Sequence, residues 1–354
     1  MIVRWLIGLS LGTLIIAATS PWFVRSYVPR TFDDVRQRVV LSPGQTYRWR
    51  AEGYATTSVG PHGMMGRINL PQAGDSRIKM LALWGDSQAE GVTVADADKL
   101  WRQLENSLGD LASNGEQRGV KVHVLPMASS GDDAGSWRRQ MPLVEQELNV
   151  SAHVLLLCEL VDLMGTVDNL SDQPTVDSTN LAATNRVANW VPDFAIHAGR
   201  NLLIAPQTMD RRRLRFGVGP VRKDLTPTQI AVREESNRVA AERRIVDNLN
   251  AISAAATMPI WVVYAPRCPL IMDGQLRVED PDSHLWNVVE RIADGTSTKV
   301  IDCRGAFRNS VARGVYPHGF HNGRFGNGHL NAVGYQLIAT EVAKHWLEVL
   351  GVAE

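Results

Sequence analysis

Five short apolar runs constrain the fold of this chain more than any other feature. They are "IKMLALW" (78–84), "VKVHVL" (120–125), "HVLLLC" (153–158), "IWVVYA" (260–265) and "KVID" (299–302). Each run is aliphatic or β-branched and nearly continuous, which is typical of parallel strands that are covered on both faces.

Segments with helical periodicity separate these runs. Leucines recur at every fourth position from Leu100 to Leu108, a second apolar stripe runs from Trp137 to Leu148, and a third covers residues 335–350. Alternation of strands and helices predicts an α/β fold, specifically a three-layer α/β/α sandwich with an open parallel sheet.

The N-terminal 25 residues predict a membrane anchor. The stretch from Trp5 to Val24 is uncharged and follows Arg4, and about 20 such residues can span a bilayer. Pro21 directly follows the small residues "AATS" and disfavours cleavage, so an uncleaved signal-anchor is favoured over a cleaved signal peptide, which would make the protein secreted. Positive charges flank the span on both sides, so the positive-inside rule does not decide its orientation. We place the body outside the cytoplasm because such segments commonly serve export.

The rest of the chain divides into two parts. A lead-in segment, residues 26–76, is rich in glycine and proline, and residues 77–354 form the predicted α/β domain with an insert at 165–225.

The composition excludes two kinds of ligand. Lys plus Arg equals Asp plus Glu at 37 each, so no nucleic-acid partner is expected. Cys158, Cys268 and Cys303 lack CxxC spacing and are predicted to be buried apolar residues rather than metal ligands.

A serine lies at the end of the first run, in "LALWGDSQAEGV" (81–92). In an open α/β sheet, sites form beyond the carboxyl ends of the strands, where Ser87 is expected. Gly85 and Gly91 permit unusual backbone angles around it. Gly-Asp-Ser also suits an ordinary turn, and a serine needs a base to become a nucleophile.

This stretch resembles the first block of the SGNH (GDSL-like) hydrolase superfamily, in particular a bacterial membrane-anchored branch. The resemblance implies a flavodoxin-like sandwich with Ser87 as nucleophile. "VLPMASSGDDAGSW" (124–137) is similar to the second block, which implies that the backbone N–H groups of Ser87 and Gly131 form an oxyanion hole. "FGNGHLNAVGYQLIA" (325–339) resembles the histidine block and implies His329 as general base, with His318 and His321 as alternatives.

Two positions depart from the family pattern. Val161 stands where the third block has an oxyanion-binding asparagine, and Asn169 or another residue of the insert is an alternative donor. The family's acid usually lies three residues before the histidine, where this chain has Gly326. The histidine then works in a Ser-His dyad oriented by a backbone carbonyl, or with Asp302 as an alternative acid.

These features lead to three functional hypotheses. The first is a serine ester hydrolase that removes O-acyl groups, acetyl above all, from an envelope glycan or lipid, with its catalytic domain in the periplasm and a single pass through the bacterial inner membrane. The second is an O-acetyltransferase of an exported polysaccharide that works beside a membrane-bound O-acyltransferase. The third is a non-catalytic glycan-binding or scaffold protein. The resemblance implies neither a metal nor an organic cofactor.

Overall fold

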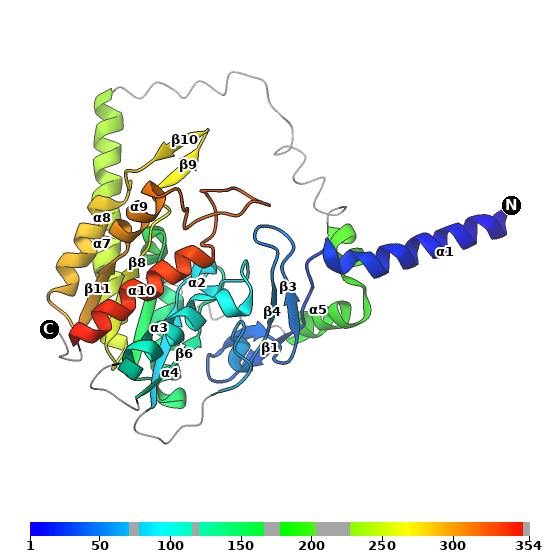
Figure 1. The fold of residues 1–354 in the computed structure, drawn as a ribbon, viewed down its shortest axis with the longest axis horizontal. Helices are drawn as coiled ribbons and strands as arrows, with labels where there is room; N and C mark the ends of the chain where they lie inside the picture. The colour runs from blue at the N-terminus through cyan, green and yellow to red at the C-terminus, as the bar shows by residue number, and fades with distance from the viewer. Residues whose placement is uncertain (71–77, 115–119, 166–177, 201, 203–226, 350–354) are drawn as a thin grey trace.

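A computed structural model describes residues 1–70, 78–114, 120–165, 178–200, 202 and 227–349 (Figure 1). The five apolar runs form one parallel sheet with the strand order β6-β5-β7-β8-β11. The strands are β5 (Ile78–Trp84), β6 (Lys121–Pro126), β7 (Ala152–Leu157), β8 (Ile260–Tyr264) and β11 (Thr298–Asp302). In the register, Leu83 of β5 pairs with Pro126 on one side and with Val154 on the other.

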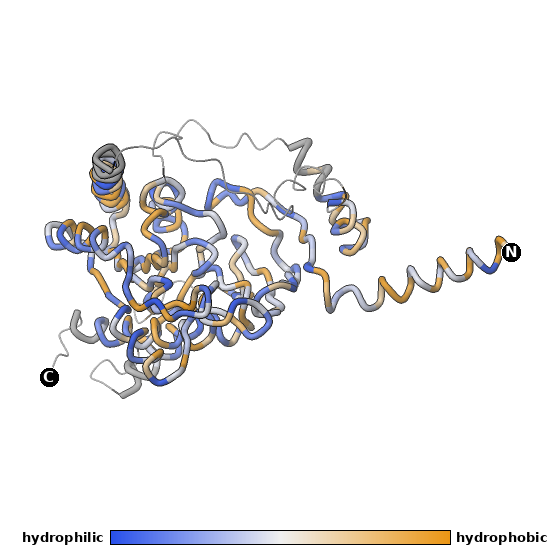
Figure 2. Tube along the Cα trace, turned by 90° about the horizontal axis from the view of Figure 1, so that it is seen from above, coloured by the Kyte–Doolittle hydropathy of each residue, from blue (hydrophilic) through white to orange (hydrophobic). Residues whose placement is uncertain are grey.

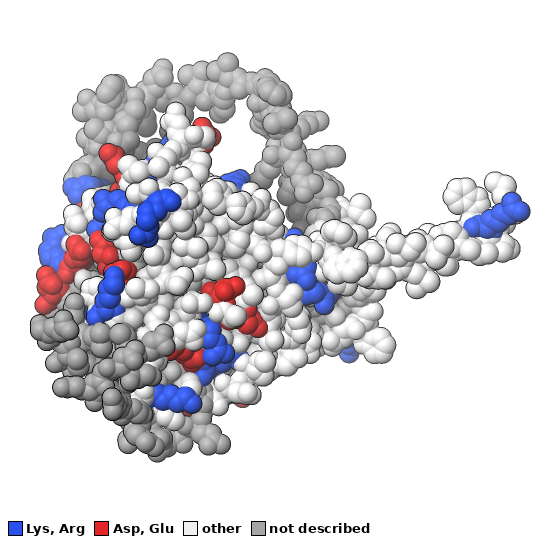
Figure 3. Space-filling model, in the orientation of Figure 1, with Lys and Arg blue, Asp and Glu red and all other residues white. Residues whose placement is uncertain are grey.

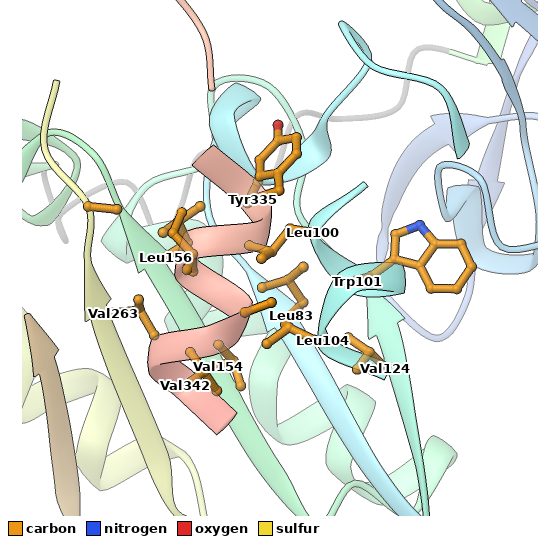
Figure 4. Packing of buried hydrophobic residues seen from close by; sticks show 14 of the residues in the cluster. Leu83, Leu100, Trp101, Leu104, Val124, Val154, Leu156, Val263, Tyr335 and Val342 are labelled. Carbon is orange, nitrogen blue, oxygen red and sulfur yellow. The ribbon is translucent and has the colours of Figure 1, made fainter. Parts of the chain in front are cut away.

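Helices cover both faces of this sheet, so the predicted three-layer sandwich is confirmed. One face carries α3 (Leu100–Asn114), α9 (Arg304–Ala312) and α10 (Ala332–Val349). The other face carries α4 (Ala134–Leu148), α7 (Pro227–Ala255) and α8 (Ser283–Ala293). Figure 4 shows the first core, where Leu83, Leu156 and Val263 of the sheet meet Tyr335 and Val342 of α10.

The second core contains large aromatic side chains. Trp84, Trp137 and Trp286 are completely buried there, and the rings of Tyr264 and Trp286 stack with centroids 4.5 Å apart. Burying one large apolar side chain stabilises a fold by roughly 1.5–3 kcal/mol. Because both faces of the sheet bury such residues, the strands read as continuous apolar runs instead of alternating ones.

The lead-in segment folds into two small antiparallel hairpins beside the main sheet (Figure 1). They are β1 (Arg30–Asp33) with β2 (Arg38–Leu41), and β3 (Thr46–Arg48) with β4 (Thr56–Ser58). A third hairpin, β9 (Leu270–Met272) with β10 (Gln275–Arg277), lies between β8 and α8 in the chain. The sequence pattern predicted none of these strands because each has only three or four residues and little burial.

The described part of the insert packs on the lead-in segment. Helix α5 (Ser178–Trp190) places Asn185 so that its Oδ1 accepts from the Arg30 N–H at 2.8 Å. Asp193 Oδ1 accepts from the Tyr27 N–H at 2.9 Å. Asn169 and residues 203–226 lie outside the described residues.

Helix α1 (Ile2–Thr19) extends away from the body, and none of its residues is buried (Figures 1 and 2). Among the described residues, Ile2–Trp22 is one helical segment long and apolar enough to cross a membrane, with a mean hydropathy of 1.8. Figure 3 shows few charged side chains along it. The body binds the end of this segment and the chain after it, because Arg50 Nε donates to the Pro21 carbonyl at 2.8 Å and the Ser26 N–H donates to the Arg48 carbonyl at 3.0 Å.

The sheet has the flavodoxin-like order, with the first strand between the second and the third. The connection after β5 runs through α3 on one face, whereas the connection after β7 leads to α7 on the other. Such a reversal opens a crevice at the carboxyl ends of the two strands. The chain places the short helix α2 (Ser87–Glu90) directly after β5, and the 3-10 turn Leu160–Met164 follows β7.

Candidate active site

The serine turn has a backbone that only glycine fits at its first position. Gly85 has φ +146°, and a Cβ there would lie 2.6 Å from the Ala89 Cβ and 2.9 Å from the Leu156 carbonyl oxygen. Asp86 caps α2, because its Oδ1 accepts from the Gln88 N–H at 2.9 Å. Ser87 is therefore held as the first residue of the helix, at the carboxyl end of β5.

Ser87 and His329 meet at this end of the sheet although 242 positions separate them. The Ser87 Oγ lies 3.2 Å from the His329 Nε2. A second acceptor, the Asp86 Oδ2, lies 3.3 Å from the same hydroxyl. The predicted nucleophile and base are thus within hydrogen-bonding reach, as the geometry of an activated serine requires.

The carboxylate of Glu52 orients His329. The Glu52 Oε2 lies 2.8 Å from the His329 Nδ1, and its Oε1 accepts from the His329 backbone N–H at 3.1 Å. Because Glu52 accepts the proton on Nδ1, Nε2 is left as the acceptor that faces Ser87. The side chains of His329 and Glu52 are 27% and 18% exposed, so the pair is sheltered but reachable by a ligand.

Neither acid position considered from the sequence supplies this carboxylate. Asp302 accepts from Arg304, at 2.9 Å from Nε and 2.8 Å from Nη2, and among the described residues it has no contact with His329. Gly326 has φ +69°, and a Cβ there would lie 2.7 Å from the Ile271 Cδ1, so a side chain does not fit. The expectations of Asp302 or of a dyad oriented by a carbonyl are therefore corrected to Glu52.

The other two candidate histidines do not face the serine. His318 is completely buried, its Nε2 lies 3.1 Å from the Pro266 carbonyl, and burial lowers its pKa to about 4. His321 stacks on the Phe325 ring at 4.8 Å. Of the three histidines considered, the structure brings only His329 to Ser87.

Two buried hydrogen bonds join the serine turn to the histidine loop and to α10, which follows that loop. The Leu330 N–H donates to the Gln88 Oε1 at 2.8 Å, and the Tyr335 hydroxyl donates to the Gln88 carbonyl at 2.6 Å. Gln88 is 1% exposed. Because Gln88 follows Ser87 and Leu330 follows His329, these bonds fix the two candidate catalytic residues against each other.

The backbone also offers two unused donors. No acceptor for the N–H groups of Ser87 and Gly131 occurs among the residues that the structure describes. Gly131 is exposed with φ +84°, and its neighbour Ser130 donates its N–H to Glu90 Oε2 of α2 at 3.2 Å. Such free N–H groups can bind a developing oxyanion. Val161 is 55% exposed and brings no donor, and Asn169 lies outside the described residues.

Carboxylates surround the serine turn. Burial raises the pKa of Asp162 to about 7, and the negative charges of Asp86 and Glu159 add to this shift. Burial also raises the pKa of Glu90 to about 7, against the opposing charge of Lys99. Both carboxyl groups therefore gain and lose a proton near neutral pH.

The three cysteines are free and buried, as the sequence predicts. Within the described ranges, no group of three or more His, Cys, Asp or Glu side chains is arranged to hold a metal ion.

Comparisons with known proteins find similarity only among solved structures. No family model and no curated protein matches the chain. A catalytic mutant of Axe2, an acetylxylan esterase from Geobacillus stearothermophilus, aligns with a TM-score of 0.37 and 12% identity over 78% of this chain and 95% of that one. LAE5, an alpha/beta hydrolase from the metagenome of Lake Arreo in Spain, aligns with a TM-score of 0.36 and 12% identity over 78% and 96%. At this level of similarity, function is inferred from the chain's own geometry.

Proposed function

We propose that this protein is a serine ester hydrolase of SGNH type that removes O-acyl groups, acetyl above all, from an envelope glycan or lipid. One observation carries the proposal. The Ser87 hydroxyl, the His329 imidazole and the Glu52 carboxylate lie in a row, joined by contacts of 3.2 and 2.8 Å. A nucleophile beside a base that a third group orients is the arrangement that activates serine.

In the acylation step, the Ser87 Oγ attacks the carbonyl carbon of the ester while His329 Nε2 takes the hydroxyl proton. Glu52 stabilises the imidazolium that forms through the Nδ1 contact. The negative charge that develops on the carbonyl oxygen is bound by the N–H groups of Ser87 and Gly131. When the carbon–oxygen bond to the leaving alcohol breaks, His329 returns the proton to that alcohol, and an acyl-serine remains.

Deacylation repeats these steps with water. His329 takes a proton from water, the hydroxide attacks the acyl carbon, and the proton returns to Ser87 Oγ as the carboxylic acid leaves. One oxyanion donor is typically worth about 10²–10³ in rate. Val161 supplies no third donor, so we expect a slower reaction than a site with three donors would give.

Helix α1 supports a location at the membrane. Its apolar, unburied length suits a single-pass anchor in a bacterial inner membrane, with the catalytic domain in the periplasm. An enzyme held there meets acylated envelope glycans or lipids, and the acetylxylan esterase Axe2 acts on an acetylated glycan by its name.

The first test is labelling of the purified full-length chain with a fluorophosphonate probe, together with hydrolysis of p-nitrophenyl acetate and of O-acetylated polysaccharides. We expect labelling and acetate release that both disappear in Ser87→Ala. A folded wild-type protein that neither reacts with the probe nor releases acetate would contradict the proposal and favour a glycan-binding scaffold.

The anchor also favours a second candidate, transfer of the acyl group to an exported glycan beside a membrane-bound O-acyltransferase. The same acyl-serine serves if a sugar hydroxyl replaces water in deacylation. Adding an unacetylated polysaccharide to the assay separates the two reactions. Acetyl-glycan that accumulates at the expense of free acetate would indicate a transferase, and unchanged acetate release would indicate a hydrolase.

A further inference from the structure

Two arginines of the β1–β2 hairpin lie against the loop that carries Gly131. We infer that Arg36 is a positioning residue that fixes residues 127–132 so that the Gly131 N–H faces the oxyanion. This inference rests on the proposed function, because it assigns a role within the same site. It concerns a part of the chain that the sequence analysis treated as a lead-in.

The Arg36 side chain is 1% exposed and binds the loop directly. Its Nη2 donates to the Met127 carbonyl at 2.6 Å and to the Ser129 hydroxyl at 3.4 Å. On its other sides, Nε donates to Gln140 Oε1 of α4 at 2.8 Å and Nη1 donates to the His62 carbonyl at 3.2 Å. One guanidinium thus connects the loop to a helix of the main domain and to the lead-in segment.

Asp132 provides a second attachment, directly after Gly131. Its side chain is 2% exposed, its Oδ1 accepts from Arg38 Nη1 at 2.5 Å, and its Oδ2 lies 3.9 Å from Arg36 Nη2. A buried carboxylate of this kind is costly unless a cation remains beside it. Moving residues 127–132 away from Arg36 and Arg38 would therefore separate the buried Asp132 carboxylate from its cations, which is energetically costly.

Gly131 is held between two fixed neighbours. On one side, Ser130 is bound to Glu90 of the serine helix, and on the other, Asp132 is bound to the arginines. Gly131 has φ +84°, and a Cβ there would have open space around it, so the glycine serves the backbone conformation and not the packing. Because a Cβ at Gly131 would meet no atom of the described residues within 4 Å, its orientation depends on these neighbouring attachments.

The test measures catalysis per active site in the full-length protein. Arg36→Met removes the cation at similar volume, and Arg36→Lys restores a charge without the forked geometry. Arg48→Met is the matched control, since Arg48 lies elsewhere in the lead-in segment and pairs with Asp193 of the insert. Titration with the fluorophosphonate probe counts the sites, and p-nitrophenyl acetate gives kcat and KM.

In Arg36→Met we expect kcat per titrated site to fall by about 10²-fold with little change in KM, because an oxyanion donor acts only in the transition state. Arg36→Lys should recover part of this loss, and Arg48→Met should behave as wild type. Wild-type kcat per site in Arg36→Met, or a loss explained by fewer sites, would overturn the inference.

Hydrogen exchange supplies a readout that does not need activity. We expect the backbone amide hydrogens of residues 127–133 to exchange with solvent faster in Arg36→Met than in wild type, and at the wild-type rate in Arg48→Met. Exchange that is unchanged in both variants would overturn the role of Arg36. If Arg36→Met does not fold, Asp132→Asn tests the attachment of the same loop to the arginines. We expect a smaller loss in this variant, about 10-fold in kcat per site. A wild-type kcat per site in Asp132→Asn would overturn the inference. A wild-type chain without Ser87-dependent labelling would instead overturn the proposed function.

Discussion

The Glu52 Oε2 and the His329 Nδ1 lie 2.8 Å apart although 277 positions separate them in the chain. Glu52 belongs to the lead-in segment, which lies between the N-terminal helix and the first strand of the sheet. The acid of the candidate triad therefore comes from outside the three-layer sandwich. The lead-in segment, which also carries Arg36 and Arg38, thus contributes a side chain to the candidate site and does more than connect the N-terminal helix to the sheet.

Glu52→Gln should lower kcat by about 10²–10⁴-fold, because an amide in this place can present its N–H₂ to Nδ1 and favour the tautomer that cannot accept from Ser87. The measurement is kcat for p-nitrophenyl acetate per titrated site. Asp302→Asn is the matched control and should keep wild-type activity, since Asp302 binds Arg304. The opposite ranking of the two variants would return the acid role to Asp302.

Gly328→Ala should affect activity through Glu52. Gly328 has φ +118°, and a Cβ there would lie 2.0 Å from the Glu52 Oε1, so an alanine must displace the carboxylate. We expect a loss of activity close to that of Glu52→Gln, and little further loss when both changes are combined, because they remove one interaction. Losses that multiply in the double variant would show that Gly328 acts independently of Glu52.

Tyr335→Phe should loosen the connection between the serine turn and α10, the helix after the histidine loop. It removes the 2.6 Å hydrogen bond to the Gln88 carbonyl inside the core, which should lower the free energy of unfolding by about 1–2 kcal/mol. Urea titration measures this loss. Tyr316→Phe is the control, since the Tyr316 ring contacts the Phe325 ring through its edge, and it should change stability little. Equal stabilities of the two variants would contradict this role of Tyr335.

Asp162→Asn should change the pH dependence of stability. The pKa of Asp162 is about 7 in the folded protein, above its ordinary value of 3.8, so the native state holds a proton that the unfolded state has lost between these pH values. The contribution of Asp162 to the free energy of unfolding therefore falls as pH rises from about 4 to 7.

The variant lacks this loss, so its stability relative to wild type should increase across the same range. With a discount for the partial exposure of the carboxyl group, the total increase should be about 1–2 kcal/mol. Urea titrations of both proteins at several pH values between 4 and 8 measure the difference. A difference that stays constant with pH would contradict the raised pKa.

The sequence predicted the central sheet well because burial on both faces leaves a strong signal. The run 78–84 coincides with β5, and the other four runs differ from their strands by one residue at one or both ends. Ser87 is expected at the carboxyl edge of the sheet because parallel strands end there, whereas His329 as its base is implied only by the resemblance to the SGNH histidine block. The structure brings them to 3.2 Å. Their catalytic roles, and that of Gly131, stay predictions until the variants are measured.

Glu52 could not be predicted because nothing local marks it. It is one of 37 acidic residues, it lies in a segment without helical or strand periodicity, and its partner is near the other end of the chain. The hairpins that carry Arg36 and Arg38 were missed for a related reason, since three- or four-residue strands with exposed positions give no alternation long enough to recognise.

The hydrogen bond from Arg50 to the Pro21 carbonyl has a consequence for where this site can work. It fastens the folded body to the last turn of the apolar N-terminal segment, so no slack chain separates the two. If that segment crosses a bilayer, Ser87 stays at a nearly constant height above the lipid headgroups. If the proposed activity also holds, only acyl groups presented at that height would reach Ser87.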